Sequence, residues 1–214
     1  IRILVQNTFL NHKSKVLDVG CNTGFVTFEI ANLAHCDVTG IDISKKMISK
    51  ANKFLHNYYK NLQKQVRFIT GDATNLPDNT FDLVVSGGST AFINNIPMAI
   101  KEYARVVKPW AFIGDINFYF HTKPPMTLIH KLNKLLNINI RRWGKDFWLE
   151  QYKKAGLELY YCFKEKMSSV SDKRIFDYAN YLVENKRWQN NVKREAKRRL
   201  INIYRLINEE HKYF

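Results

Sequence analysis

Two rhythms of apolar positions alternate along the first 120 residues. Short apolar runs predict strands at 16–19, 37–41, 66–70, 81–85 and 110–117. Between them apolar residues recur every three or four positions, which predicts helices over 24–34, from 44 onward and over 97–107. Alternating strands and helices form a parallel sheet with right-handed crossovers. We therefore expect an α/β fold: a Rossmann-like, doubly wound, mainly parallel sheet with helices on both faces.

Helix-start signals agree with this pattern. Thr23 and Ser44 are residue types that cap helix N-termini, and Pro97 is tolerated in a first helical turn. After His121 the rhythm changes, and helices are predicted over 126–136, 146–155, 172–185 and 188–210. Residues 157–163 (LELYYCF) alternate like a strand. No strand pattern follows, so we expect a last strand to lie beyond residue 214, and the natural start to precede Ile1.

The charge of the chain is large and unevenly spread. The net charge is +15, with 13 Lys+Arg against 9 Asp+Glu in residues 1–120 and 21 against 10 in residues 121–214. Such a surface attracts nucleic acid, membrane phosphate or an anionic small substrate, although a merely solvated basic face explains it equally.

The remaining composition narrows the class of protein. Three scattered cysteines without a CxxC pair argue against a disulfide framework or a zinc site, so we expect no metal and a cytoplasmic location. No apolar stretch approaches the roughly 20 residues that span a bilayer. The first ten residues resemble an amphipathic helix and lack the features of a signal peptide.

Candidate chemistry follows the first two predicted strands. The loop Asp18-Val-Gly20-Cys-Asn22-Thr-Gly24 opens the first helix, and Asp42 lies 18 residues beyond Gly24. Glycines admit a ligand close to the backbone, and a carboxylate at the second strand end accepts ribose hydroxyls. A nicotinamide-dependent dehydrogenase is the first competitor. Its GxGxxG spacing is absent, and Asp18 would repel a pyrophosphate while suiting an ammonium group.

Longer motifs carry a specific resemblance. The runs VLDVGCNTGFVTFEIA, VTGIDIS, VRFITGDATNLP, FDLVVS and AIKEYARVVKP occur in order within residues 15–118, with a weaker echo in FWLEQYKKAGLEL. Together they resemble the class I S-adenosylmethionine-dependent methyltransferases, and most the group of small-molecule and quinone-biosynthesis C-methyltransferases. The resemblance implies a methyltransferase domain at 1–163, with a cofactor half at 15–118 and an acceptor-side half at 119–163. Residues 164–214 would then form a basic helical extension or lid, not an independent domain.

The resemblance also implies roles for single residues. Asp18 would lie beneath the methionine ammonium, and Asp42 would hold the ribose hydroxyls of S-adenosylmethionine. The full expected cofactor set is Asp18, Gly20, Asn22, Gly24, Asp42, Ile43, Met47, Asp72, Ala73, Ser86 and Gly87. Met47 also has core spacing, and Ser86 also suits a strand end that needs its backbone satisfied. S-adenosylhomocysteine would be the product.

Two departures from the family pattern stand out. Asn22 replaces the usual middle glycine of the loop, so its side chain must point away from the ligand or touch it. Trp110 replaces the glycine that commonly follows the Lys-Pro turn.

The acceptor is not encoded in any motif. Asp115, Asn117, Tyr119 and His121 are strand-end candidates for a general base, and none is favoured over an ordinary loop role. A small metabolite, including an anionic one, is the expected acceptor. RNA is the alternative, because Lys193, Arg194, Lys197 and Arg198 flank an apolar stripe on the last helix. The oligomeric state stays open.

Overall fold

The computed structural model describes residues 1–72, 74, 76–165, 168–184, 186 and 188–213. They group into two compact units, one of Ile1–Asn117 with Leu149–Tyr161 and one of Phe118–Trp148 with Cys162–Phe214. The division into a domain at 1–163 and an extension at 164–214 stays a prediction. Residues 118–148 join the C-terminal helices because the helix they contain packs against the last helix.

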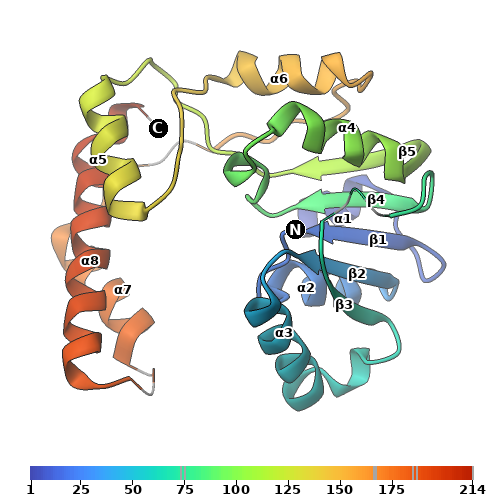
Figure 1. Cartoon of the computed structure of the whole chain (residues 1–214), viewed down its shortest axis with the longest axis horizontal. Coiled ribbons are helices and arrows are strands. Elements are labelled where there is room, and N and C mark those ends of the chain that lie inside the picture. Colours follow the sequence, from blue (N-terminus) through green and yellow to red (C-terminus); the bar gives the residue numbers. More distant parts are fainter. Residues whose placement is uncertain (73, 75, 166–167, 185, 187, 214) are drawn as a thin grey trace. The chain divides into compact units, whose positions relative to one another are not determined.

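The first unit is built on a five-stranded parallel sheet. Its strands are β1 (Lys15–Val19), β2 (Asp37–Asp42), β3 (Val66–Thr70), β4 (Phe81–Ser86) and β5 (Val107–Asp115). Their order is β3-β2-β1-β4-β5 (Figure 1). The order reverses between β1 and β4, and in open α/β sheets ligands bind at the carboxyl ends of the strands at such a point. The predicted Rossmann-like fold is confirmed.

Helices of this unit follow the predicted pattern. They are α1 (Arg2–Asn7), α2 (Phe25–Ala34), α3 (Lys45–Tyr58), α4 (Ile96–Val106) and the greater part of α6 (Lys145–Lys154), with short 3-10 turns at Lys60–Leu62 and Thr90–Phe92. The Ser44 cap is confirmed, since its hydroxyl accepts from the Met47 N–H at 3.4 Å. The Thr23 cap is wrong: Gly24 is the N-cap of α2, with φ +91°.

The central strands supply the core. Val16 and Leu17 of β1 and Leu83 and Val84 of β4 have no exposed surface. Near-continuous apolar strands are typical of a parallel sheet covered on both faces, and each such side chain stabilises the fold by about 1.5–3 kcal/mol. This core holds the strand ends, and the loops that follow them, in place.

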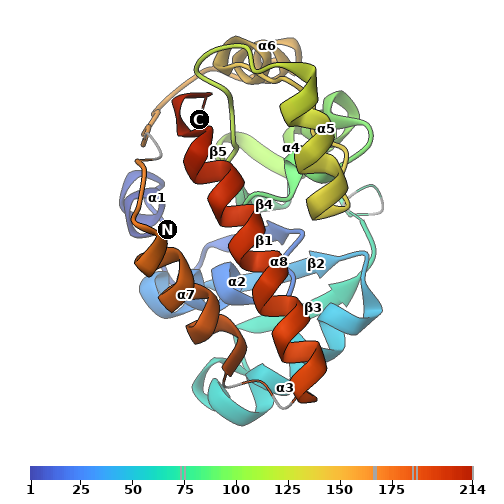
Figure 2. The ribbon, with the colours of Figure 1, turned by 90° about the vertical axis from the view of Figure 1, so that its left-hand side faces the viewer.

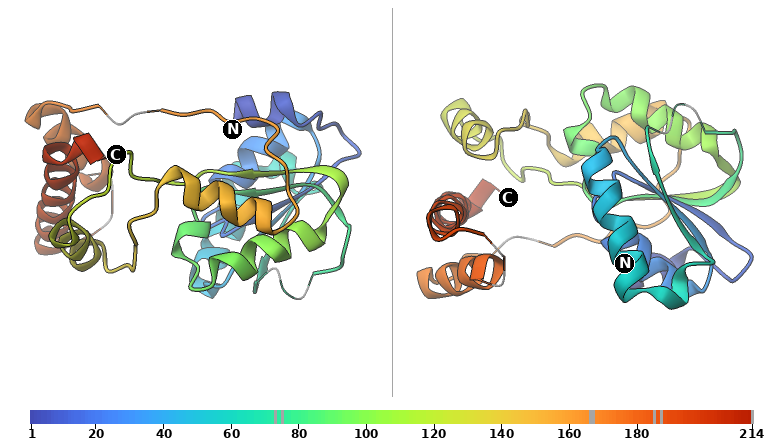
Figure 3. Two further views of the ribbon diagram at one scale, coloured as in Figure 1. Left: turned by 90° about the horizontal axis from the view of Figure 1, so that it is seen from above. Right: turned by 60° about the horizontal axis from the view of Figure 1, so that its bottom comes forward.

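The second unit is helical. It contains α5 (Met126–Leu136), α7 (Asp172–Glu184), α8 (Asn190–Glu209) and a final turn at His211–Tyr213. Figure 2 shows α5 and α7 along α8, and the right panel of Figure 3 looks nearly along α8 with the other two on either side. Ile175, Ala179 and Val183 form the buried face of α7 at a spacing of four.

One predicted element is wrong. Residues 157–163 form no strand, and Leu159, Tyr160 and Phe163 are each more than 60% exposed. An alternating pattern becomes a strand only when a neighbouring strand offers backbone partners, and this segment has none. No strand follows residue 163 in the described part of the chain. Among the described residues, no helix is long and apolar enough to cross a membrane.

Candidate functional site

The loop after β1 lies at the point where the strand order reverses. Gly20 and Gly24 have φ of +68° and +91°, a conformation that favours glycine. A Cβ on Gly20 would collide with the Ser89 side chain, and one on Gly24 would lie 2.6 Å from Phe68 Cζ. Both glycines are therefore required by close packing as well as by backbone conformation. The Gly20 and Cys21 N–H groups donate to Ile41 O at 2.8 and 3.0 Å, which ties the loop to the end of β2.

Asn22, which stands where the family pattern has glycine, has a left-handed backbone conformation. Its φ is +52°, in the left-handed region that asparagine adopts more readily than most residues. Its side chain is exposed, and its N–H donates to Asp42 Oδ2 at 2.9 Å. Trp110 behaves in the same way, with φ +63°. Both residues thus adopt a backbone conformation that favours glycine.

Asp42 is fixed by backbone groups on both oxygens. Asn22 N–H donates to Oδ2, and Ser44 N–H donates to Oδ1 at 2.8 Å. A carboxylate offers about four acceptor positions, so each oxygen keeps a free lone pair. The side chain is half-buried at the end of β2. This geometry suits a pair of neighbouring hydroxyl donors, as on a ribose.

Asp18 is almost wholly buried, with 1% of its surface exposed. Thr27 Oγ1 donates to its Oδ2 at 2.6 Å, while Oδ1 has no partner among the described residues. Burial raises the pKa of Asp18 from 3.8 to about 6, the Thr27 hydrogen bonds oppose this rise, and the Asp42 charge adds to it. An unsatisfied buried carboxylate of this kind is complementary to a positively charged donor such as an ammonium group.

The side of the loop facing β2 and β3 is more open. Ile43 directly follows β2 with 80% of its surface exposed, and Met47 is half-buried on α3. Asp72 is exposed, and hydrogen bonds from the Thr74 hydroxyl and N–H hold its pKa below the usual range. An apolar surface beside a carboxylate suits a purine ring with an amino group. Ala73 lies outside the described residues.

A chain of hydroxyl groups follows β4. Ser89 Oγ donates to Val19 O at 2.6 Å, so the Ser86 hydroxyl supplies the proton of the 2.9 Å Ser86–Ser89 contact. Thr90 Oγ1 in turn donates to Ser86 Oγ at 2.9 Å and lies 3.2 Å from Tyr103 Oη. The buried Ser86 hydroxyl thus already forms hydrogen bonds within the protein, whereas Gly87 is exposed. The sequence analysis did not predict Ser89, Thr90 or Tyr103 as site residues, although the run SGGST at 86–90 lies directly at the end of β4.

The end of β5 carries a second polar group. The Tyr152 hydroxyl donates to Asp115 Oδ2, and Asn117 Nδ2 donates to the Tyr152 oxygen at 3.0 Å. Asp115 Oδ1 and Asn117 Oδ1 are buried without a partner among the described residues. Burial raises the pKa of Asp115, whereas the nearby polar side chains of Tyr152, Asn117, Thr90 and Ser86 lower it. Tyr152 was missed because it comes from α6, 35 residues beyond Asn117, and the FWLEQYKKAGLEL run around it carries no sign of this contact.

The other two candidates for a general base belong to the second unit. These are Tyr119 and His121, whose ring centroids are 5.2 Å apart. His121 is exposed, and its N–H donates to Tyr213 O at 2.8 Å. Within the first unit, Asp115 and Asn117 share a hydrogen-bond partner, the Tyr152 hydroxyl.

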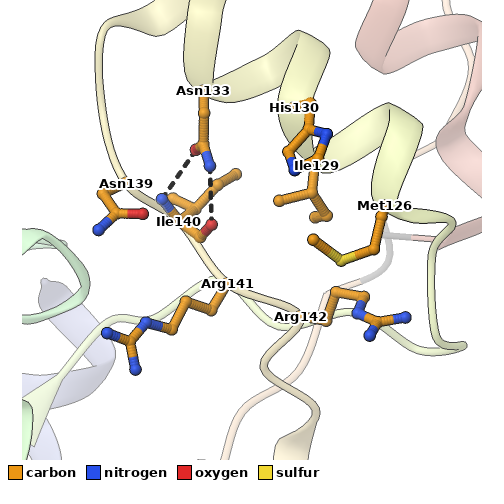
Figure 4. Close-up of a pocket in the computed structure, with 8 residues that line it drawn as sticks. All are labelled: Met126, Ile129, His130, Asn133, Asn139, Ile140, Arg141 and Arg142. Carbon is orange, nitrogen blue, oxygen red and sulfur yellow. Dashed lines mark hydrogen bonds between the residues drawn. The ribbon is translucent and has the colours of Figure 1, made fainter.

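The second unit also contains a hollow of about 250 Å³ beside α5. Asn133 closes one side by bonding both the N–H and the carbonyl of Ile140 (Figure 4). Arg141 and Arg142 line it, but their guanidinium groups point to opposite sides (Figure 4). They do not converge on one anion, so the hollow is not the candidate site. No cluster of metal-binding side chains occurs among the residues that the structure describes.

Comparison with known sequences agrees with this geometry. Residues 16–110 match the family described as "Methyltransferase domain". A demethylmenaquinone methyltransferase of Staphylococcus haemolyticus is 33% identical over 126 residues, which cover 56% of this chain and 49% of that enzyme. The chain thus aligns with about half the length of this curated relative.

Solved structures share the fold over nearly the whole chain. The MccD protein superimposes with a TM-score of 0.82 and 25% identity, covering 99% of this chain and 91% of its own. A phosphoethanolamine N-methyltransferase of Haemonchus contortus gives a TM-score of 0.77 at 17% identity, covering 99% of this chain and 49% of its own. That structure contains phosphomonomethylethanolamine and S-adenosylhomocysteine.

Proposed function

We propose that the chain is a class I S-adenosylmethionine-dependent methyltransferase that methylates a small metabolite, anionic metabolites included; the match of residues 16–110 to the family described as "Methyltransferase domain" supports this. The carrying observation is the pairing of Asp42, which keeps two free lone pairs, with the buried and unsatisfied Asp18. One carboxylate suits a ribose and the other an ammonium group. S-adenosylmethionine contains both, joined through its sulfonium.

We assign the cofactor contacts on this basis. Gly20, Asn22 and Gly24 would border the methionine part and the ribose, with Asp18 near the ammonium and Asp42 on the hydroxyls. Ile43, Met47, Asp72 and Ala73 would surround the adenine. Gly87 is supported by its exposure at the end of β4. For Ser86 only the backbone is free to take part, because its hydroxyl already bonds Thr90 and Ser89.

Methyl transfer from S-adenosylmethionine requires the protein mainly to position the two reactants. The bound donor supplies a sulfonium leaving group, and no metal is needed for that reaction. The chain's own residues then have to orient the reactants and exclude water. The Asp18 carboxyl is poised for this: an approaching cation would offset the burial that raises its pKa, and so stabilise the ionised form.

A small acceptor is supported by two observations. The relatives named for their substrates, among them the demethylmenaquinone methyltransferase, act on small molecules. The polar groups after β4 and β5 are short and close together, as a compact pocket requires. The net charge of +15 favours an anionic acceptor over a cationic one. We also propose a cytoplasmic location, supported by three cysteines that are all free.

RNA methylation is the second candidate function. The charge asymmetry favours it, because residues 121–214 carry 21 of the 34 Lys+Arg. Binding to RNA phosphates would weaken steeply as salt is raised, whereas binding of a small metabolite would change far less. We propose residues 164–214 as an extension of the enzyme in either case, not as an independent domain.

Isothermal titration with S-adenosylhomocysteine tests the donor assignment. Asp42→Ala should weaken binding roughly a hundredfold, because two hydrogen bonds to a charged group are lost. Asp37→Ala is the matched control, since this exposed aspartate lies at the other end of the same strand. Absence of binding to the unaltered protein would overturn the proposed function. A labelled methyl donor added to a cell lysate then identifies the acceptor.

A further inference from the structure

Two buried oxygen atoms at the end of β5 lack hydrogen-bond donors. Asp115 ends the strand and Asn117 follows two residues later, so a shared hydroxyl, that of Tyr152, bonds both side chains. Tyr152 leaves one oxygen of each unpartnered, Asp115 Oδ1 and Asn117 Oδ1. Buried acceptors are nearly always satisfied in folded proteins, so a pair of free ones calls for a ligand.

Neighbouring hydroxyl groups do not supply the missing donors. Ser86 and Thr90 lie close enough to Asp115 to lower its pKa. Their protons, however, are directed along the chain from Thr90 to Ser86 and from Ser86 to Ser89, which itself donates to Val19 O. Neither hydroxyl proton is therefore directed at the two free oxygens.

In the part of the chain that the structure describes, Asp115 also has no positively charged partner. Among the described residues, no lysine, arginine or histidine forms an ion pair with Asp115, and no cation is among the causes that shift its pKa. Buried carboxylates are normally paired with a cation or kept neutral. A neutral hydroxyl ligand would satisfy one oxygen and leave the charge uncompensated.

We infer that Asp115 and Asn117 form a binding site for an ammonium group of a bound molecule. An ammonium carries up to three N–H donors and one positive charge, so it can bond both oxygens and neutralise the carboxylate. This inference rests on the proposed function, because the site lies at the same edge of the sheet, in strand register with Ser86 of β4. It narrows the ligand to one that carries an amine.

Two sources of that ammonium group are possible within the proposed reaction: the amino-acid part of the donor, or an amine on the acceptor. The first experimental arm compares S-adenosylhomocysteine with 5′-methylthioadenosine, which has the same nucleoside and thioether but no ammonium. The second arm titrates protein saturated with S-adenosylhomocysteine with ethylammonium chloride and, in parallel, with ethanol. Both arms use calorimetry, so neither depends on turnover.

Asp115→Asn is the test variant, because the new amide can still accept from Tyr152 while losing the charge and the free acceptor. A loss of threefold or more in affinity for S-adenosylhomocysteine, with 5′-methylthioadenosine unchanged, assigns the site to the donor. The same loss for ethylammonium in the second arm assigns it to an acceptor amine. Asp37→Asn removes an equal charge elsewhere and should change neither titration.

Smaller changes in both arms, or ethylammonium binding no better than ethanol together with an unchanged first arm, would overturn the inference. If Asp115→Asn does not fold, Asn117→Leu removes the second free oxygen and is judged by the same thresholds. The two proposals stay distinguishable. Failure of the unaltered protein to bind S-adenosylhomocysteine counts against the proposed function, whereas normal binding without ammonium selectivity counts against this site alone.

Discussion

At the scale of single residues, Asp18 makes stability depend on pH. Its folded-state pKa of about 6 exceeds its ordinary value of 3.8, so its contribution to stability is full below pH 4 and is lost as the pH rises through 6. A shift of about two units corresponds to about 3 kcal/mol. Asp18→Asn should therefore raise the free energy of unfolding of the ligand-free protein at pH 7.5 by up to about 3 kcal/mol, as measured by urea denaturation.

The same variant should show almost no gain at pH 3, where Asp18 is protonated in the native state and largely so in the unfolded chain. It should also bind S-adenosylhomocysteine more weakly, because the charge facing the ammonium is gone. A variant that is less stable than the unaltered protein at pH 7.5 would show that Asp18 is not an uncompensated buried charge.

Gly20 illustrates a requirement that combines conformation and space. Gly20→Ala should lower the free energy of unfolding by about 1–2 kcal/mol for a left-handed backbone and by about 1–3 kcal/mol more for the collision with Ser89. Gly156→Ala is the matched control, with φ +78° and no neighbouring atom within 4 Å. Urea denaturation should show the larger loss at Gly20. Equal losses would mean that the packing against Ser89 contributes nothing.

The sequence groups the residues around the ends of β1 and β2, but it does not group Tyr152 with Asp115. Asp18, Gly20, Gly24 and Asp42 follow neighbouring strands, and the carboxyl ends of parallel strands meet at one edge. Local spacing is therefore enough to group them. Tyr152 reaches Asp115 only through the packing of α6 near β5, which no local pattern encodes.

At the scale of elements, Ser44 at the start of α3 makes two separate contacts. One contributes to the stability of the helix, and the other holds a residue of the proposed binding site. Ser44 Oγ caps the helix through the Met47 N–H, while the Ser44 backbone N–H holds Asp42. Ser44→Ala should cost about 1 kcal/mol in the free energy of unfolding and leave the affinity for S-adenosylhomocysteine within threefold. Thermal unfolding and calorimetry check the two parts. A large loss of affinity would mean that the hydroxyl itself positions Asp42.

Predicted helices and strands are confirmed where the local apolar pattern is matched by a neighbouring element that the segment can pack against or pair with. The core strands and α5, predicted at 126–136 and observed at Met126–Leu136, fall in this class. Residues 157–163 have the alternation of a strand but no partner strand, so the prediction failed. The Thr23 cap failed for a different reason, since the left-handed Gly24 starts α2 with no side-chain cap.

At the scale of the whole molecule, the distribution of charge separates the two candidate functions. The basic residues of α8 already have contacts within the protein: Lys193 Nζ donates to Glu184 O, Lys197 lies 4.2 Å from the Phe176 ring centroid, and Arg198 pairs with Glu195. These exposed contacts are weak, each about 1 kcal/mol or less, so replacing the residues should not unfold the chain.

Replacing Lys193, Arg194, Lys197 and Arg198 together with glutamine should therefore leave both S-adenosylhomocysteine affinity and lysate methylation within threefold of the unaltered protein. A small-molecule acceptor explains this result, because it does not need a long phosphate-binding surface. The matched control replaces four exposed lysines of the first unit, Lys50, Lys53, Lys60 and Lys64, and removes the same charge.

An RNA acceptor predicts the opposite: a ribonuclease-sensitive labelled product, lost in the α8 variant and retained in the control. It also predicts that the slope of log affinity against log salt becomes shallower by about 3 when four phosphate contacts are removed. Observing both would move the proposed acceptor from a metabolite to RNA.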